Sequence, residues 1–151
     1  MSPVSHIIAS GVISSIFGLV TQSLQASLAC FVGGIFMDID HFFDYCLHHK
    51  KVICSFKELK DYCFHEREGK MFLVFHAWEI ICILWIIVYY FQLGLFWIGL
   101  LLGMSAHLFL DQVCNDWQEK THLLAYFGFF RLKHGFKKKV IHRDTYQKPK
   151  R

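Results

Sequence analysis

The four residues Asp38-Ile39-Asp40-His41 constrain the fold more than any other feature of the sequence. They end a stretch of 31 residues, Ile7 to Met37, in which Cys30 is the only ionisable side chain. Carboxylates beside so long an apolar stretch cost free energy unless a cation or hydrogen-bond donors compensate them, and acids at such places in membrane proteins mark candidate functional sites. A bound metal ion is the simplest compensation.

The composition places the chain among membrane proteins. Hydrophobic residues make up 54% of its 151 residues, and its mean hydropathy is +0.35, which is high for a soluble domain of this length. Its six cysteines are scattered and include no Cys-x2-Cys pair, so we expect reduced thiols and no disulfide framework.

Four apolar segments predict an all-α fold, a four-helix bundle embedded in a membrane. The first two predict a hairpin of short helices, although one long helix over residues 7–37 is an alternative. The third has 22 residues with Glu79 as its only charge and is the clearest membrane helix. The segments are Ser5–Val20, Ala26–Phe43, Met71–Gln92 and Leu95–Cys114, the last with a Gly99-x3-Gly103 pattern that favours close helix contact.

Two charged regions accompany these segments. Residues 44–70 predict a loop, with a short amphipathic helix over 56–64. Residues 118–151 form a basic tail that follows the membrane domain of residues 1–117 and holds 10 of the 16 Lys and Arg residues. Within the tail, Leu123–Phe136 predicts an amphipathic interfacial helix, and the chain from Lys137 onward predicts a basic arm. Beside a membrane domain such a tail favours anionic headgroups, and we expect no nucleic-acid partner.

The distribution of basic residues predicts the orientation in the membrane. With four crossings, residues 44–70 lie on the same side as both termini, and these regions hold all 16 Lys and Arg residues, whereas the turns near Gln22 and Gly94 hold none. The positive-inside rule then places both termini in the cytoplasm, for a protein integral to an inner or plasma membrane. Every polar island in the apolar segments falls in the cytoplasmic half, a convergence that is lost if residues 7–37 cross only once.

The spacing within these islands favours a metal site. Asp38 and His41 are three residues apart, as are His76 and Glu79, and His107 and Asp111 are four apart, so each pair is expected to share a helix face. Helical bundles build metal sites from such pairs on facing helices. Imidazole and carboxylate ligands suit zinc, manganese or iron, and the absence of clustered cysteines argues against a structural zinc finger.

At these residues the sequence resembles the YdjM-type membrane-bound metal-dependent hydrolases, which look distantly related to the zinc-dependent phospholipases C. The resemblance rests on His6, Asp38-x-Asp40-His41, His76 and His107-x3-Asp111, and leaves the tail uncovered. Members of that family tend to carry a His-Arg-Gly-x-Thr-His element before the third helix. The nearest equivalent here begins at His65 and departs from that pattern, which favours a subfamily with an altered substrate.

The resemblance implies a helical bundle that holds two or more divalent ions, zinc first, and hydrolyses a phosphoester of a phospholipid or lipid-linked phosphate at the cytoplasmic leaflet. The alternatives are a transporter or channel for metal ions or protons, and a membrane scaffold with a structural metal. Asp40 and Glu79 are the expected catalytic carboxylates. Asp40 is expected either to bind a metal or to orient the water, and Glu79 either to bridge the ions or to support a ligand from behind. Arg67 and Lys70 are expected to bind the phosphate. The expected metal ligands are His6, Asp38, His41, His76, His107 and Asp111.

Overall fold

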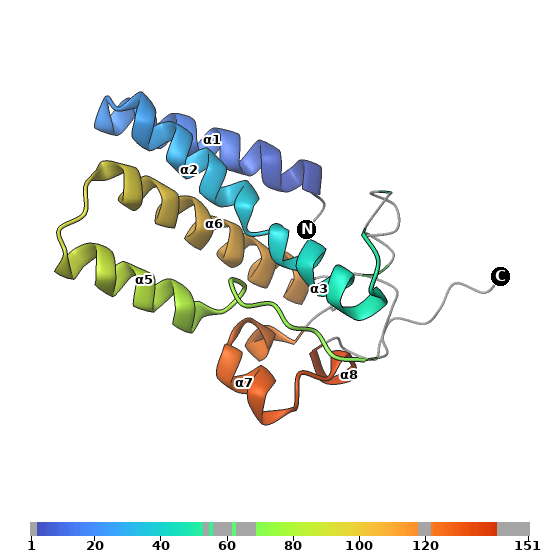
Figure 1. Ribbon diagram of the computed structural model, residues 1–151. Helices are drawn as coiled ribbons and strands as arrows, with labels where there is room; N and C mark the ends of the chain where they lie inside the picture. Colours follow the sequence, from blue (N-terminus) through green and yellow to red (C-terminus); the bar gives the residue numbers. More distant parts are fainter. Residues whose placement is uncertain (1–2, 53–54, 56–61, 63–68, 118–121, 142–151) are drawn as a thin grey trace.

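The computed structural model describes residues 3–52, 55, 62, 69–117 and 122–141 and shows an all-helical chain (Figure 1). No β-strand occurs within these ranges, where one isolated antiparallel bridge pairs Lys70 with Lys137. The predicted helical bundle is therefore confirmed. The elements are α1 (Pro3–Thr21), α2 (Leu24–Phe36), α3 (Ile39–His49), α5 (Trp78–Tyr90), α6 (Leu95–Trp117), the 3-10 helix η1 (Leu123–Tyr126), α7 (Gly128–Lys133) and α8 (Lys138–Ile141).

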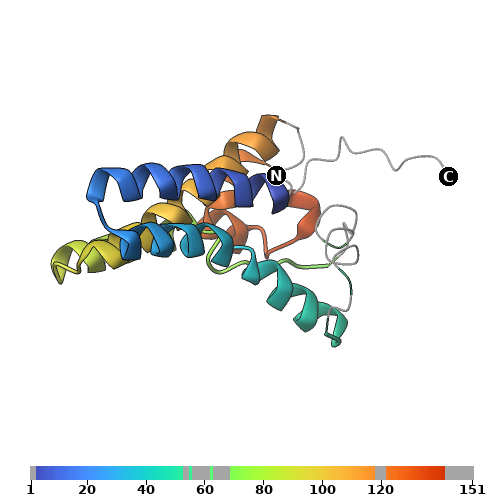
Figure 2. The same cartoon turned by 90° about the horizontal axis from the view of Figure 1, so that it is seen from above.

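Helices α1 and α2 form the predicted hairpin, so the alternative of one long helix is wrong. Gln22 turns the chain with a φ of 52°, and the Ser23 hydroxyl caps α2 by accepting a hydrogen bond from the Ala26 amide. The turn after α1 and the loop between α5 and α6 lie at one end of the bundle, and the N-terminus, α3, α7 and α8 lie at the other (Figures 1 and 2).

Helices α2 and α6 pack backbone against backbone. A Cβ atom at Gly99 would collide with the carbonyl oxygen of Ala26, and one at Gly103 would collide with that of Cys30. Gly33 is as tight against Leu100 from the opposite side. The expected close contact at the Gly99-x3-Gly103 pattern is confirmed. It brings Asp38, which follows Gly33 on the chain, to the same depth in the bundle as His107, which follows Gly103.

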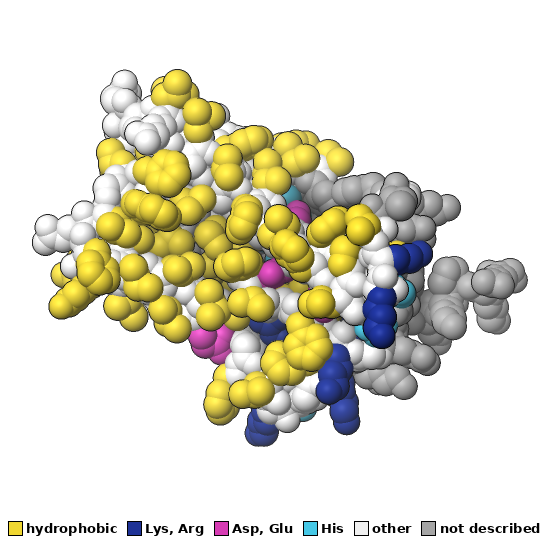
Figure 3. Space-filling view, in the orientation of Figure 1, with side chains coloured by type: hydrophobic (Ala, Val, Ile, Leu, Met, Phe, Trp, Pro, Cys, Tyr) yellow, Lys and Arg dark blue, Asp and Glu magenta, His cyan; other side chains and the backbone are white. Residues whose placement is uncertain are grey.

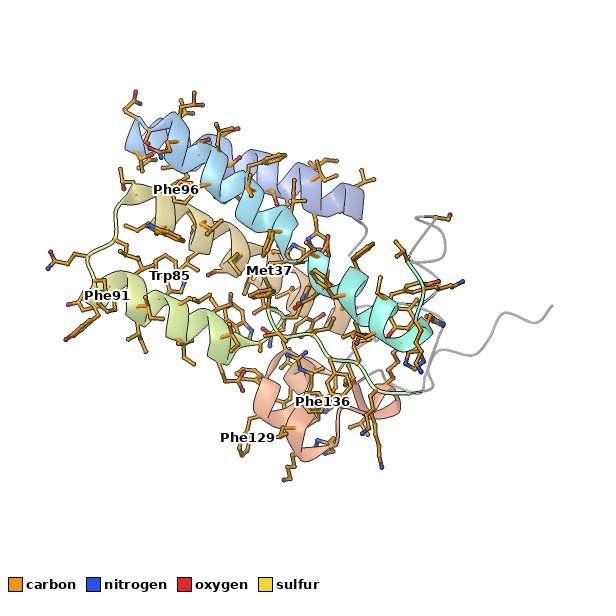
Figure 4. All side chains as sticks on the ribbon, in the orientation of Figure 1. Met37, Trp85, Phe91, Phe96, Phe129 and Phe136 are labelled. Atoms are coloured by element: carbon orange, nitrogen blue, oxygen red, sulfur yellow. The ribbon has the colours of Figure 1, made fainter. Side chains whose placement is uncertain are left out.

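The second apolar segment does not continue as one helix to Phe43. It ends at Phe36, turns at Met37 and Asp38, and restarts as α3 at Ile39. Asp38 occupies the N-cap position of α3, yet its side chain makes no capping hydrogen bond. Its carboxylate therefore stays available to other partners. Figure 4 shows the buried Met37 at this break, facing into the bundle.

The third apolar segment corrects a sequence prediction, because its helix α5 begins at Trp78 and not at Met71. Residues 71–77 are irregular, and side chains from elsewhere take the place of helical hydrogen bonds. Asp44 accepts from the amide of this segment's second residue, Asp40 accepts from two further amides, and Arg131 donates to two carbonyls. His76 and Glu79 consequently do not share a helix face.

Three helical stretches within the described part of the chain are long and apolar enough to cross a membrane: Val4–Thr21, Leu24–His49 and Leu95–Asn115. Helix α5 is apolar but has only 13 residues. The space-filling view shows apolar side chains covering the bundle, with Lys and Arg gathered at the end that carries α7 and α8 (Figure 3). This distribution is the one expected of a membrane-associated protein.

The described part of the tail packs against the rest of the chain and differs from the expected continuous helix over Leu123–Phe136. Phe127 is extended, with φ −109° and ψ 122°, and separates η1 from α7. Main-chain hydrogen bonds join Phe136 to Met71 and Lys138 to Gly69. The expected helix over 56–64, apart from Tyr62, and the end of the basic arm lie outside the described residues. Cys30, Cys46, Cys82 and Cys114 are free thiols, as expected.

Candidate metal centre

Two helices, α1 and α6, and two connecting segments bring five of the predicted metal ligands together. Among the described residues, two groups of His and Asp side chains each place one ligand atom per residue within 4.8 Å of the others. His107 belongs to both groups, so they form one cluster. The groups are His6 with His107 and Asp111, and Asp38 with His76 and His107.

His107 defines the electrostatics of the cluster. Its Nδ1 donates to the carbonyl oxygen of Gly34 at 2.6 Å, so the neutral ring carries a lone pair on Nε2. Nε2 is fully buried and makes no hydrogen bond, yet it lies 3.6 Å from Oδ1 of Asp38 and 3.5 Å from Oδ2 of Asp111. Three electron-rich atoms therefore face one another in a buried place, an arrangement that calls for a positive charge between them.

The distances around His107 fit a metal ion better than a proton. Zinc binds His nitrogen and carboxylate oxygen at about 2.0–2.2 Å, and tetrahedral geometry then separates two ligands by about 3.4 Å. The observed separations of 3.5 and 3.6 Å are close to that value. A shared proton would draw nitrogen and oxygen to about 2.7–2.9 Å. The cluster thus has the donor atoms and spacing of a divalent metal site.

His76 reaches the cluster from the segment before α5, and Asp40 sets its orientation. Nδ1 of His76 lies 3.3 Å from Oδ2 of Asp40, which also accepts from the amides of Phe75 and His76. Nε2 of His76 is buried without a hydrogen bond and faces Oδ2 of Asp111 at 3.9 Å. A carboxylate behind the imidazole is the common second contact of metal-binding histidines. In the structure Asp40 therefore contacts His76 and its segment and belongs to neither ligand group.

The two carboxylate oxygens of Asp111 have different neighbours. Oδ1 accepts hydrogen bonds from Nε2 of His6 at 2.9 Å and from the side-chain Nδ2 of Asn115 at 3.3 Å. Oδ2 faces His107 and His76. The Tyr126 hydroxyl donates to the Asp111 carbonyl and accepts from Asn115. The sequence analysis missed Asn115 and Tyr126, although Asn115 lies four residues after Asp111 on the same helix face.

Other predicted site residues lie apart from the two groups. The half-buried His41 ring lies 4.8 Å from the ring of His76 but contributes to neither group. Lys70 is exposed at its bridge with Lys137. Arg67 and His65 fall outside the described residues.

Glu79 belongs to neither group of candidate ligands and contacts α7 instead. Its two carboxylate oxygens accept hydrogen bonds from the amides of Gly128 and Phe129, at 2.8 and 3.0 Å. A carboxylate bound to the first amides of a helix stabilises that end of the helix. Glu79 therefore fastens α7 to the start of α5.

Arg131 is a further residue that the sequence analysis missed. It lies on α7, is 2% exposed, and donates to the carbonyl oxygens of Leu73 and His76. Burial lowers the pKa of the guanidinium from its usual value, and the negative charges of Asp40 and Glu79 oppose that shift. In the sequence, Arg131 appears only as one arginine in an aromatic segment. That pattern is also typical of an interfacial helix, so it did not indicate a buried arginine near the site.

The cluster is open on one side. The side chain of Asp38 is 35% exposed, whereas those of His6, His76, His107 and Asp111 are 8% exposed or less. A molecule in solvent or in the membrane interface can therefore approach the cluster past Asp38. Catalytic metal sites keep such an open position, and structural sites are usually closed by protein ligands.

The chain has no match in the three comparisons with known proteins. No protein-family model, no curated protein and no solved structure matches it at a significant level. The resemblance to the YdjM-type hydrolases thus rests on the motif spacing alone. The donor atoms and their surroundings carry the argument for function.

Proposed function

We propose that this protein is a membrane-embedded hydrolase that uses a divalent cation, zinc first, to cleave a phosphoester of a membrane lipid. One observation carries the proposal: the buried Nε2 of His107 faces the carboxylates of Asp38 and Asp111 with no hydrogen-bond partner. With Nε2 of His76, these atoms form a set of two nitrogens and two oxygens, which suits zinc, manganese or iron.

The exposure of Asp38 favours a catalytic over a purely structural metal. A substrate phosphate would reach the cluster past Asp38, whose side chain is the most exposed of the five candidate ligands. A divalent cation held there would generate hydroxide near neutral pH and polarise a phosphoryl oxygen, which is the chemistry of phosphoester hydrolysis. Asp40 holds the proton on Nδ1 of His76, so that Nε2 keeps its lone pair directed at the cluster.

Two considerations favour a lipid phosphoester as the substrate. The motif spacing of Asp38-x-Asp40-His41 and His107-x3-Asp111 resembles that of the YdjM-type hydrolases. Exposed lysines also lie at the polar end of the bundle, where headgroup phosphates would meet a membrane-embedded chain (Figure 3). With the basic regions in the cytoplasm, that end faces the cytoplasmic leaflet. The lysines are Lys50, Lys51, Lys70, Lys133 and Lys137.

The first test is the metal content of the full-length protein purified in detergent and reconstituted with zinc. We expect at least one equivalent in the wild type and loss of stoichiometric metal in His107→Ala and Asp38→Ala. His134→Ala is the matched control, because Nδ1 of His134 contacts the carbonyl oxygen of Phe130 in α7 and the residue belongs to neither ligand group. A wild-type protein without bound zinc, manganese or iron would overturn the proposal.

The second test concerns the reaction. Wild-type protein in vesicles that contain phospholipids and isoprenyl phosphates should release a water-soluble phosphate product, and Asp38→Ala should release none. Stoichiometric metal without turnover of any of these lipids would support the metal site but overturn the proposed hydrolase activity. Metal flux across the same vesicles would then identify a transporter.

A further inference from the structure

The segment that carries His76 is held from both sides by charged side chains. Arg131 donates through Nη1 to the carbonyl of Leu73 at 2.6 Å and through Nη2 to the carbonyl of His76 at 2.7 Å. On the other side, Asp40 accepts from the amides of Phe75 and His76. The peptide groups around His76 therefore bond to an arginine from the tail and an aspartate from α3, since this segment forms no helix of its own.

The guanidinium suits this position for a geometric reason. Its planar fork presents two N–H groups at fixed spacing, and the two carbonyls lie three residues apart on an irregular segment. Arg131 is 2% exposed and belongs to α7, which Glu79 fastens to α5 through the amides of Gly128 and Phe129. In Figure 1, α7 lies beside the segment that precedes α5. Through Arg131, the tail thus contacts the segment that carries His76.

We propose that Arg131 is a positioning residue that sets His76 for metal binding, which makes the C-terminal tail a required part of the centre. The proposal rests on the proposed function for the metal and on the described contacts for the clamp. Without the guanidinium, the carbonyls of Leu73 and His76 lose these hydrogen bonds, and next to His76 only the amide contacts of Asp40 remain. Nε2 of His76 then moves relative to Oδ2 of Asp111, and the cluster keeps its other ligands but loses a nitrogen.

Hydrogen exchange on metal-free protein tests the clamp by itself. In Arg131→Met, the amides of Phe75 and His76 should exchange at least about tenfold faster than in wild type, since their segment opens more often. Lys133→Met is the matched control, because Lys133 is an exposed basic residue of the same helix, and its exchange should equal that of wild type. Equal exchange in Arg131→Met and wild type would overturn the proposal.

Cobalt(II) substitution tests the consequence for the ligands. The visible absorption of bound cobalt reports its ligand set, so the spectrum of Arg131→Met should match that of His76→Ala and differ from that of wild type. Zinc affinity should fall by about 10–100-fold, as is usual when a contact that orients a ligand is removed. A wild-type cobalt spectrum in Arg131→Met would overturn the proposal.

Arg131→Lys keeps the test decisive if Arg131→Met does not fold. One ammonium group replaces the two N–H donors of the guanidinium incompletely. Zinc affinity should therefore lie between those of wild type and His76→Ala, and the amides of Phe75 and His76 should exchange faster than in wild type. Wild-type values for both would overturn the clamp. If the wild type binds no metal at all, the proposed function fails while the exchange experiment still decides whether Arg131 holds the segment.

Discussion

The imidazole rings of His6 and His107 stack with their centroids 3.9 Å apart and their planes 14° from parallel. This contact joins the start of α1 to the second half of α6, across 101 residues of sequence. Nε2 of His6 also donates to Asp111, so the ring packs against one predicted ligand and bonds to another. The N-terminal turn is therefore part of the site.

His6→Phe separates these two contributions. The phenyl ring preserves the stacking on His107 but removes the nitrogen that bonds Oδ1 of Asp111. We expect zinc affinity to fall by about 10–100-fold, because the carboxylate loses the contact that orients it. Isothermal titration in detergent measures the affinity, and a melting temperature within a few degrees of wild type shows that the fold survives. Unchanged affinity would remove His6 from the site.

Gly103→Ala tests the contact between α2 and α6. The new methyl group would collide with the Cys30 carbonyl, so the helices must separate, at a cost of about 1–3 kcal/mol. His107 lies one turn further along α6, and we expect zinc affinity to fall along with stability. Gly94→Ala is the control, since no atom lies within 4 Å of its added Cβ. Unfolding in denaturing detergent compares the two, and equal stability would contradict backbone contact between the helices.

Asp40→Asn separates the effect of the hydrogen bonds that Asp40 accepts from the effect of its negative charge. An asparagine oxygen can still accept from the amides of Phe75 and His76, so the melting temperature should change little. The negative charge behind His76 is lost, and we expect zinc affinity to fall by about tenfold or more. Asp40→Ala should also destabilise the fold, since it leaves buried amides unpaired at about 1–3 kcal/mol each. Wild-type zinc binding in both variants would show that Asp40 does not act through His76.

Glu79→Gln tests the reassignment of that carboxylate. The amide side chain can satisfy one of the two α7 amides, so we expect a loss of about 1–2 kcal/mol in the free energy of unfolding. Stoichiometric metal should remain, because Glu79 belongs to neither group of candidate ligands. Metal analysis and chemical unfolding of the same preparation give both numbers. Full stability with abolished turnover would restore the catalytic role predicted from the sequence.

The sequence alone predicted that His6, Asp38, His107 and Asp111 lie close together. Apolar length, the turn at Gln22 and the i, i+4 spacing of His107 and Asp111 are local signals, and antiparallel helices convert them into a shared depth. The Gly99-x3-Gly103 pattern likewise predicted a close helix contact on α6, although the sequence did not identify α2 as the partner. These features follow from helix periodicity and from the burial of apolar surface.

The start of α5 was mispredicted because the hydropathy of a segment contains no information about the hydrogen-bond partners of its backbone. Residues 71–77 are apolar enough for a helix, but Asp40, Asp44 and Arg131 offer their backbone other partners. Those partners lie about 30 to 60 residues away in sequence, so no window that fits one helix includes them. The same long separation hid Arg131 as a neighbour of the site.

The shortness of α5 has a consequence for the surrounding lipid. Thirteen residues of helix rise about 20 Å, which is less than a hydrocarbon thickness of about 30 Å, so a crossing of the membrane at α5 would require a locally thinned bilayer. The bilayer beside α5 would dimple toward the end where the irregular segment carries His76. Headgroups and water would descend to the metal cluster there, so the protein should partition into thin, poorly ordered membranes in preference to thick, sterol-rich ones.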